Sequence, residues 1–289
     1  MILVGVALCV LTYFITAGGT KGVASIFSKL VPFMSILYIL MGIGMIVVNL
    51  DQVPSAIATI FTGAFTGHAA VGGFAGSVVS GMIQTGMARS VYSNEAGWGT
   101  SPMVHASADT RHPVEQGLWG SFEVFFDTFI VCSITALSVI LSGMWTDGST
   151  GGSLSLSAFS SSFGTIGSIL LAIIMVIFTV TTSGGWFTYY LALLEHMNMK
   201  ENVFTKILMK LFYLTRALPG LLWTIYLVKT GNTGFIWTVV DITSAIPTFV
   251  NVFVILLLSG QYFKLLKDYK ARYMGIGQVD PKTKLFYEE

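Results

Sequence analysis

The amino-acid sequence predicts an all-α integral membrane protein. Hydrophobic residues make up 54% of its 289 residues and charged residues only 10%, whereas soluble domains carry about 25% charged residues. The mean hydropathy is +0.76. Several apolar runs also reach the roughly 17–25 residues that a helix needs to cross the hydrocarbon core of a bilayer. We therefore expect a multi-pass protein whose partner is the lipid bilayer.

Apolar runs along the chain predict about seven membrane-spanning helices. Six runs cover residues 2–17, 31–50, 118–141, 166–194, 207–228 and 235–260. A seventh covers residues 55–83 and contains Gly72, Gly73 and Gly76, each of which weakens a helix by about 1 kcal/mol relative to alanine. Gly72 and Gly76 also have the four-residue spacing that more often marks close helix packing than a binding site.

Basic residues gather in alternate connections, and basic loops mark the cytoplasmic side of a membrane. We therefore expect the polar loop 86–117 and a tail from about residue 262 to be cytoplasmic, with the protein in the cell membrane. The Ser/Gly-rich connection 143–162 is expected outside, with Lys229, and Asp241 near the outer edge of its span is interpreted as hydrated. The basic loop residues on the inner side are Lys21, Lys29, Arg89, Arg111, Lys200 and Lys206.

Other classes of function find little support in the residues. The formal net charge is +1, so we expect no nucleic-acid partner, and the oligomeric state is left open. No nucleotide-binding or paired-cysteine motif occurs and the histidines lack ligand spacing, so we expect no cofactor and no metal catalysis. Ser101 and His105 are four residues apart, yet no carboxylate at a suitable spacing orients the histidine. We therefore do not expect an enzyme.

Two carboxylates, Glu123 and Asp127, lie at positions i and i+4 on one helical face within the apolar span 118–141. A carboxylate at such depth is costly unless it faces the bundle interior or water. One interpretation is an ion or proton relay, which makes both residues ion-coupling candidates. The other is a structural partner for a polar group on another helix, and the residues alone favour neither.

The run from Phe178 to Trp186, FTVTTSGGW, places four hydroxyls in five positions, and we expect it to interrupt its span. Hydroxyls at such positions commonly bond back to the carbonyl four residues earlier, which is the simpler interpretation. The alternative is a cation site, because adjacent hydroxyls and a freed carbonyl offer hard oxygen ligands. Irregular backbone is tolerated within a membrane where it lines a cavity.

Several segments resemble one known family. Residues 89–117, RSVYSNEAGWGTSPMVHASADTRHPVEQG, followed by FFDTFIVCSITALSVILSG, strongly resemble the signature of the alanine or glycine:cation symporters, also called sodium:alanine symporters. The likeness continues in GGTKGVASIFSKLVPFMSILYIL near the start, AAVGGFAG at the glycines, FTVTTSGGW in the hydroxyl run and SAIPTFVNVFVILLLSG in the last span. The resemblance is ordered along the chain.

The resemblance implies a leucine-transporter-like fold, in which two five-helix halves form an inverted repeat. Residues 1–289 would form one transporter domain that supplies the end of the first half and all of the second. The family's Gly-rich first core helix, which binds the substrate carboxylate, and the two helices after it lie outside these 289 residues. We therefore expect no transport by this chain alone.

The resemblance also implies a function and a site. The function would be sodium-coupled symport of small neutral amino acids, alanine or glycine, by alternating access. Thr181 and Thr182 match the family's hydroxyl pair at a sodium site, with the carbonyl of Phe178 as a third ligand. Trp186 and Thr182 would shape the substrate pocket together with the segment Gly72, Gly73, Phe74, Ala75 and Gly76.

The chain departs from the family pattern at Thr179, where alanine is usual, at Ser183, where an isoleucine-like residue is usual, and at Leu191-Ala192, where Gly-Glu follows the tyrosine pair. These changes would retune the pocket or the inner gate. A non-transporting membrane scaffold, or an inactive fragment of such a transporter, stays open as the alternative function.

Overall fold

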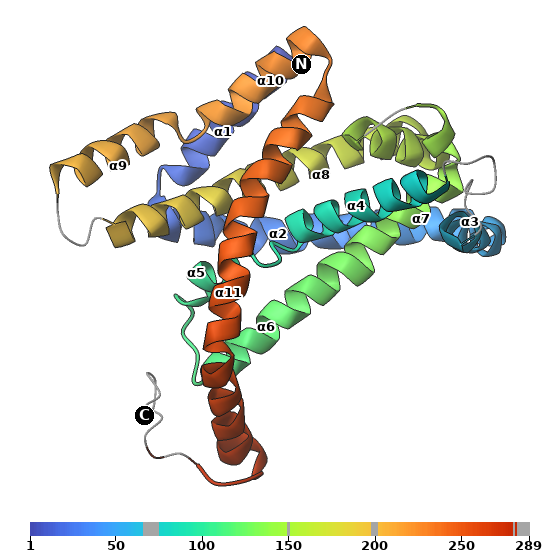
Figure 1. Cartoon of the computed structure of the whole chain (residues 1–289). Coiled ribbons are helices and arrows are strands. Elements are labelled where there is room, and N and C mark those ends of the chain that lie inside the picture. The colour runs from blue at the N-terminus through green and yellow to red at the C-terminus, as the bar shows by residue number, and fades with distance from the viewer. Residues whose placement is uncertain (66–74, 149–150, 198–201, 280, 282–289) are drawn as a thin grey trace. The chain divides into compact units, whose positions relative to one another are not determined.

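The structure is a computed structural model that describes residues 1–65, 75–148, 151–197, 202–279 and 281, with side chains except at 64–65, 75–80 and 82. Every element in this part of the chain is helical, as the sequence predicted (Figure 1). The elements are α1 (Ile2–Thr16), α2 (Gly19–Val48), η1 (Leu50–Gln52), α3 (Val53–Phe65), α4 (Ala75–Ser93), α5 (Ser101–His105), α6 (Pro113–Phe125), η3 (Phe126–Cys132), α7 (Ser133–Ser142), η4 (Met144–Thr146), α8 (Gly151–Met197), α9 (Val203–Thr215), α10 (Leu218–Thr230) and α11 (Thr233–Met274).

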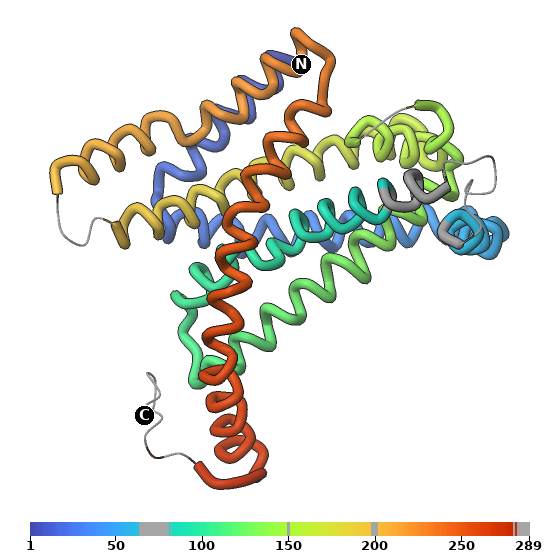
Figure 2. Tube along the Cα trace, in the orientation of Figure 1, coloured from blue at the N-terminus to red at the C-terminus, as the bar shows by residue number. Residues whose placement is uncertain are grey.

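Four helical segments within the described residues are long and apolar enough to cross a membrane: Gly19–Val48, Pro113–Ser142, Gly151–Met197 and Thr233–Met274. Helices α9 and α10 pass the same test as a pair bent by 49° (Figure 2). Many large apolar side chains point outward, such as Leu257 with 83% of its surface exposed. These features are typical of a multi-pass membrane protein; the number seven for its spans stays a prediction.

The chain forms two compact units, one of residues 1–82 and 131–233 and the other of residues 83–130 and 234–289. In the first unit α2 and α8 run side by side, and α1 and α7 pack against them (Figure 1). Glycine makes the close approach possible, because a Cβ added to Gly42 of α2 would overlap the Cγ2 methyl of Ile134 in α7. Val23, Phe187 and Leu191 form a buried cluster in this unit.

In the second unit, α6 begins at a capping histidine that packs on α11. His112 precedes Pro113, and its Nδ1 accepts a hydrogen bond of 3.1 Å from the backbone N–H of Val114, which satisfies one of the free donors of a helix start. The imidazole is buried, with Tyr269 and Tyr273 of α11 against it, at ring-centroid distances of 5.1 and 5.9 Å. The loop before α6 is thereby held on α11.

Two helices extend beyond the predicted bounds of their spans, which were 166–194 and 235–260. The connection 143–162 is not a loop throughout, because α8 begins at Gly151 and its non-helical residue is Gly164, with φ +59°. The last span was predicted to end at residue 260, whereas α11 continues to Met274, so the first part of the predicted cytoplasmic tail is helical. Its last turns are supported by the ion pair between Asp268 and Arg272, 2.7 Å apart and four residues apart in sequence.

Two predicted spans contain irregularities. The span 118–141 includes a π-helical segment, Phe126–Cys132, between α6 and α7. The span 207–228 bends between α9 and α10, where Pro219 lies in the first turn of α10. The predicted break in the span 55–83 falls between α3 and α4, and residues 66–74 lie outside the described part of the chain.

Candidate functional site

The hydroxyl-rich run of α8 forms regular helix, so the expectation that it interrupts the span was wrong. Thr179 donates to the carbonyl of Met175 at 2.8 Å, and Thr181 donates to the carbonyl of Ile177 at 2.9 Å. Ser183 bonds back to its own helix in the same way, at 2.8 Å. Such bonds satisfy the hydroxyls without freeing any backbone group, which is why the helix continues.

Helix α8 has two different faces along this run. One face carries the buried residues Thr181, Gly184, Phe187 and Leu191. Successive helical residues are rotated by about 100°, so Thr182 points away from that face and is exposed. Trp186, one turn later, is half-buried, and Tyr190 is 50% exposed. The helix therefore has an open face that carries Thr182 and Trp186.

The structure brings two of the three predicted sodium ligands together. The hydroxyl oxygen of Thr181 lies 3.1 Å from the carbonyl oxygen of Phe178. This hydroxyl donates its one proton to its own helix, but its oxygen keeps lone pairs that can bind a cation. Thr181 is only 6% exposed and lies against Met34 of α2, with 3.8 Å between its hydroxyl oxygen and the sulfur. Thr182 faces the open side.

The predicted substrate residues are described only in part. Gly72, Gly73 and Phe74 lie outside the described residues, while the backbones of Ala75 and Gly76 start α4. Trp186 belongs to an aromatic group on α8, with its ring centroid 5.4 Å from that of Tyr189 and 5.8 Å from that of Tyr190. The indole is thus supported within its own helix on the open face.

Both carboxylates of the span 118–141 have polar partners within the second unit. The Nε2 of His105 lies 3.2 Å from Oε2 of Glu123, and the hydroxyl of Ser93 donates to Oδ2 of Asp127 at 2.6 Å. Thr128, the next residue of the π segment, donates to the side-chain oxygen of Asn94 at 3.1 Å. The interpretation of Glu123 and Asp127 as structural partners therefore has direct geometric support.

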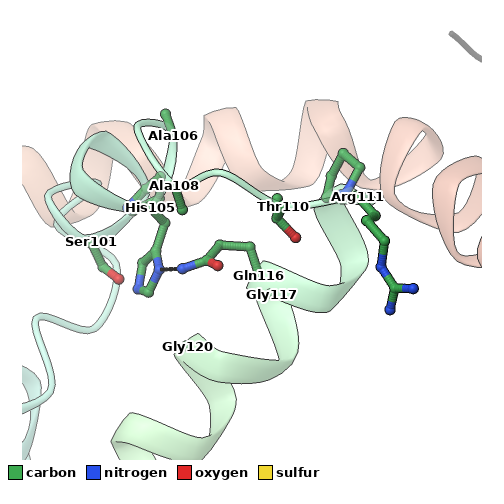
Figure 3. A pocket seen from close by; sticks show the side chains of 11 residues that line it. Ser101, His105, Ala106, Ala108, Thr110, Arg111, Gln116, Gly117 and Gly120 are labelled. Carbon is green, nitrogen blue, oxygen red and sulfur yellow. Dashed lines mark hydrogen bonds between the residues drawn. The ribbon is translucent and has the colours of Figure 1, made fainter. Parts of the chain in front are cut away.

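Glu123 is a carboxylate neighbour of His105 that the sequence spacing did not predict. The hydrogen bonds of His105 nevertheless do not allow it to activate Ser101. Its second ring nitrogen, Nδ1, lies 2.6 Å from the side-chain nitrogen of Gln116 (Figure 3). With Nε2 facing Glu123, neither nitrogen is left to accept the proton of the serine. His105 and Gln116 line a cavity of about 650 Å³ in the second unit, together with Ser101, Pro102, Ala106, Ala108, Thr110, Arg111, Pro113, Gly117 and Gly120.

Arg216, which the sequence reading overlooked, lies at the bend between α9 and α10. Its Nε donates to the hydroxyl of Thr16 at 2.7 Å, and its terminal nitrogens donate to the carbonyls of Tyr13 and Tyr213. These carbonyls belong to the last turns of α1 and α9, where unpaired carbonyls and the helix dipoles favour a cation. An arginine at the middle of an apolar span was the available signal.

Arg89 and Asp241 form an ion pair in the second unit. One guanidinium nitrogen of Arg89 lies 2.5 and 2.7 Å from the two carboxylate oxygens. The guanidinium also stacks on Trp237, 3.9 Å from the ring centroid. The interpretation of Asp241 as merely hydrated was therefore wrong. The sequence predicted that Arg89 lies at the inner end of one span and Asp241 near the outer edge of another. Two residues at those depths could not form this ion pair, so the two predicted depths are not both correct.

Comparison with known families agrees with these features. The model of the sodium:alanine symporter family matches residues 1–282, nearly the whole chain. The chain belongs to the sodium:alanine symporter family. This is the family whose signature the polar loop 86–117 resembles, and its members are transporters, so the sequence and the comparison agree that the chain is not an enzyme.

Relatives of this chain within the family have been given different names. The uncharacterized transporter YflA of Bacillus subtilis is 32% identical over 92% of this chain and 55% of its own length. The putative sodium/proton-dependent alanine carrier protein YrbD is 34% identical over 96% of this chain and 59% of its own length. The probable sodium/glutamine symporter GlnT is 32% identical, over 87% and 50%. YrbD and GlnT are also from Bacillus subtilis. This chain spans about half the length of these three relatives.

Proposed function

We propose that the protein takes part in sodium-coupled symport of small neutral amino acids, alanine or glycine, across the cell membrane by alternating access. Membership of the sodium:alanine symporter family supports an amino-acid:cation symporter. The name of YrbD refers to alanine and that of GlnT to glutamine, and both are uncharged amino acids. The proposed leucine-transporter-like fold and the cytoplasmic tail belong to the same proposal.

The observation that carries the proposal is the two-faced hydroxyl run of α8. Thr181 is held on the packed face beside the carbonyl of Phe178, while Thr182 and Trp186 lie one turn apart on the open face. Oxygen ligands for sodium and an indole wall for a small side chain are therefore adjacent on one helix. In membrane transporters, ligands and coupling ions are bound where helices face a cavity at mid-membrane.

The roles of individual residues follow from this arrangement. Phe178, Thr181 and Thr182 would supply oxygen atoms to sodium, and Thr182 would lie between the ion and the substrate. Trp186 would limit the size of the substrate side chain. The segment from Gly72 to Gly76 would close the pocket with its backbone. Glu123 and Asp127 are kept as ion-coupling candidates, because a carboxylate that accepts one hydrogen bond retains other lone pairs.

Uptake of labelled alanine into proteoliposomes tests the proposal. Because the chain spans about half the length of its relatives, we compare the chain alone with the complemented protein, meaning the chain expressed together with the part of YrbD outside the matched region. We expect no uptake by the chain alone and sodium-dependent uptake by the complemented protein. Complemented uptake that is equal with sodium and with choline would overturn sodium coupling, and no uptake in either case would favour the scaffold.

A further inference from the structure

A small polar cavity lies where α1, α8 and α10 meet. These helices all belong to the first unit, and α1 runs beside both α8 and α10 (Figure 1). The cavity has a volume of about 130 Å³, which at roughly 30 Å³ for each water equals about four water molecules. Its polar wall comes from Arg216 and from the hydroxyls of Thr12, Thr179, Ser183 and Thr224. The cavity therefore has room for one small ion or molecule.

Arg216 brings a positive charge to this wall. In the part of the chain that the structure describes, it bonds to the hydroxyl of Thr16 and to the carbonyls of Tyr13 and Tyr213, and it lies over three aromatic rings. No carboxylate is among these contacts, and each partner carries only partial negative charge. A guanidinium does not lose its proton in proteins, and a charge within an apolar span is costly unless a counter-charge or water faces it. An anion in the cavity would therefore be stabilised.

Hydrogen-bond donors also remain at this wall. A guanidinium has five N–H groups, and the three bonds to Thr16 and the two carbonyls leave two of them. Helix α10 begins beside Arg216, and its N-cap residue Ala217 makes no side-chain capping bond. The N–H groups of a first helical turn have no partner within the helix, and Gly220 of that turn lines the cavity. The positive end of the α10 dipole thus adds to the charge of the guanidinium.

The four lining hydroxyls can serve as further donors. Each now donates to the carbonyl four residues earlier in its own helix, at 2.8–2.9 Å. In a regular helix that carbonyl also accepts a backbone N–H, so a hydroxyl that turns its proton toward the cavity leaves no backbone group unsatisfied. A cation at the same place would be repelled by Arg216 at close range. The wall therefore favours an anion.

We propose that this cavity binds a small monovalent anion, with Arg216 as its counter-charge and the lining hydroxyls as donors. A chloride ion and the carboxylate group of a small acid share this chemistry, and the experiments below distinguish them. The bound anion joins α1, α8 and α10 around the bend that follows α9. Its binding does not rest on the proposed symport function, because no sodium ligand is needed for it.

The first experiment measures thermal unfolding of the full chain, purified in detergent, in the sodium salts of three anions at equal ionic strength. Chloride and acetate are small enough for the cavity, whereas gluconate is not. We expect a higher melting temperature in the anion that fills the cavity than in gluconate, because a ligand that binds only the folded protein stabilises it. A rise in chloride assigns the site to a halide, and a rise in acetate alone assigns it to a carboxylate. Equal melting temperatures in all three salts would refute the site.

Three variants separate binding at the cavity from a general effect of salt. Arg216→Gln removes the counter-charge and should abolish the difference between the salts. Thr224→Val removes one lining hydroxyl at nearly constant volume and should reduce it. Thr230→Val is the matched control on the same helix, because its hydroxyl also bonds back, to Tyr226 at 2.9 Å, and does not line the cavity.

Arg216→Gln also loses bonds to α1. If this variant does not fold, the two threonine variants decide the question. Salt effects of equal size in Thr224→Val and Thr230→Val would contradict the proposal.

The second experiment follows the line width of the chloride resonance, because bound chloride relaxes faster than free chloride. Chloride as the ligand predicts that the protein broadens the line, that Thr224→Val weakens the broadening and that Thr230→Val does not. A carboxylate as the ligand predicts no broadening together with the acetate effect on the melting temperature. Absence of both effects would overturn the inference. Neither experiment measures transport, so a failure of sodium-driven uptake would refute the symport function and leave the anion site standing.

Discussion

Adjacent threonines of α8 occupy different surroundings, and the proposed chemistry depends on this difference. Thr181 is buried beside Met34 and the carbonyl of Phe178, whereas Thr182 is exposed on the face that carries Trp186. A sodium ion at this helix would need oxygen atoms from both sides of the boundary between the packed and open faces. The hydroxyl bonds to the helix do not compete with this role, because they use the hydroxyl protons and leave oxygen lone pairs.

Trp186→Ala tests the size limit of the substrate pocket at the level of one residue. Removing the indole should open space on the exposed face of α8 and remove contacts with a small substrate. In the complemented protein we expect the affinity for alanine to fall at least about tenfold, equal to roughly 1.4 kcal/mol, and competition by leucine to increase. Trp223→Ala, which removes an indole from α10, is the control. An unchanged preference between alanine and leucine would exclude Trp186 from the pocket wall.

The sequence predicted some residue-level features and missed others for a physical reason. The closeness of Phe178 and Thr181 follows from three-residue spacing on a helix and was predictable. The contacts of Arg216 with Thr16 and Tyr13 join positions about 200 residues apart. The contact between His105 and Glu123 joins a loop helix to a span. Such pairs depend on how elements fold back on each other, which local spacing does not specify.

At the scale of elements, the apolar runs located helices well, but glycine and hydroxyl content did not locate their irregularities. Gly184 and Gly185 lie in regular helix, and a Cβ at Gly184 would overlap the ring of Phe27, so that glycine serves helix packing. The non-helical residue of α8 is Gly164 instead. The π segment Phe126–Cys132 consists of ordinary apolar and polar residues, and no local sequence pattern predicts it.

Gly42→Ala tests the packing of α2 on α7. A Cβ at Gly42 would overlap the Cγ2 of Ile134, and both residues are buried. Forcing a methyl group into a packed interface commonly costs about 1–3 kcal/mol, so the melting temperature of the purified protein should fall. Gly22→Ala in the same helix meets no atom within 4 Å and should be neutral or stabilising. Equal melting temperatures for the two variants would show that α2 and α7 do not meet in this way.

At the scale of the whole molecule, the family match and the apolar helices establish the class, whereas topology depends on loop charge. Lys206 in the first turn of α9 and Lys229 in the last turn of α10 should lie on opposite sides of the membrane if the bent pair is one span. Basic loops predict Lys206 inside and Lys229 outside. Lys200, also expected inside, lies outside the described residues.

Single cysteines at positions 206 and 229, with Cys9 and Cys132 replaced by alanine, test this topology in intact cells. An impermeant thiol reagent should label position 229 and leave position 206 unlabelled until the membrane is opened. Both positions are exposed in the structure, so accessibility within the protein does not limit labelling. The reverse pattern would invert the orientation, and labelling of both positions would mean that the bent pair does not cross the membrane.

Coupling between sodium and substrate at the hydroxyl run of α8 is the central claim, and the sodium dependence of alanine affinity measures it most directly. In the complemented protein, Thr182→Val or Thr181→Val removes one oxygen ligand at nearly constant volume. Apparent sodium affinity should fall at least about tenfold, equal to roughly 1.4 kcal/mol. Alanine affinity should fall at low sodium and largely recover at high sodium, because coupling between two ligands is reciprocal. Thr188→Val, whose hydroxyl bonds back to Gly184 on the same helix, should change neither quantity. Unaltered sodium dependence in both the Thr181 and the Thr182 variants would contradict the assigned site.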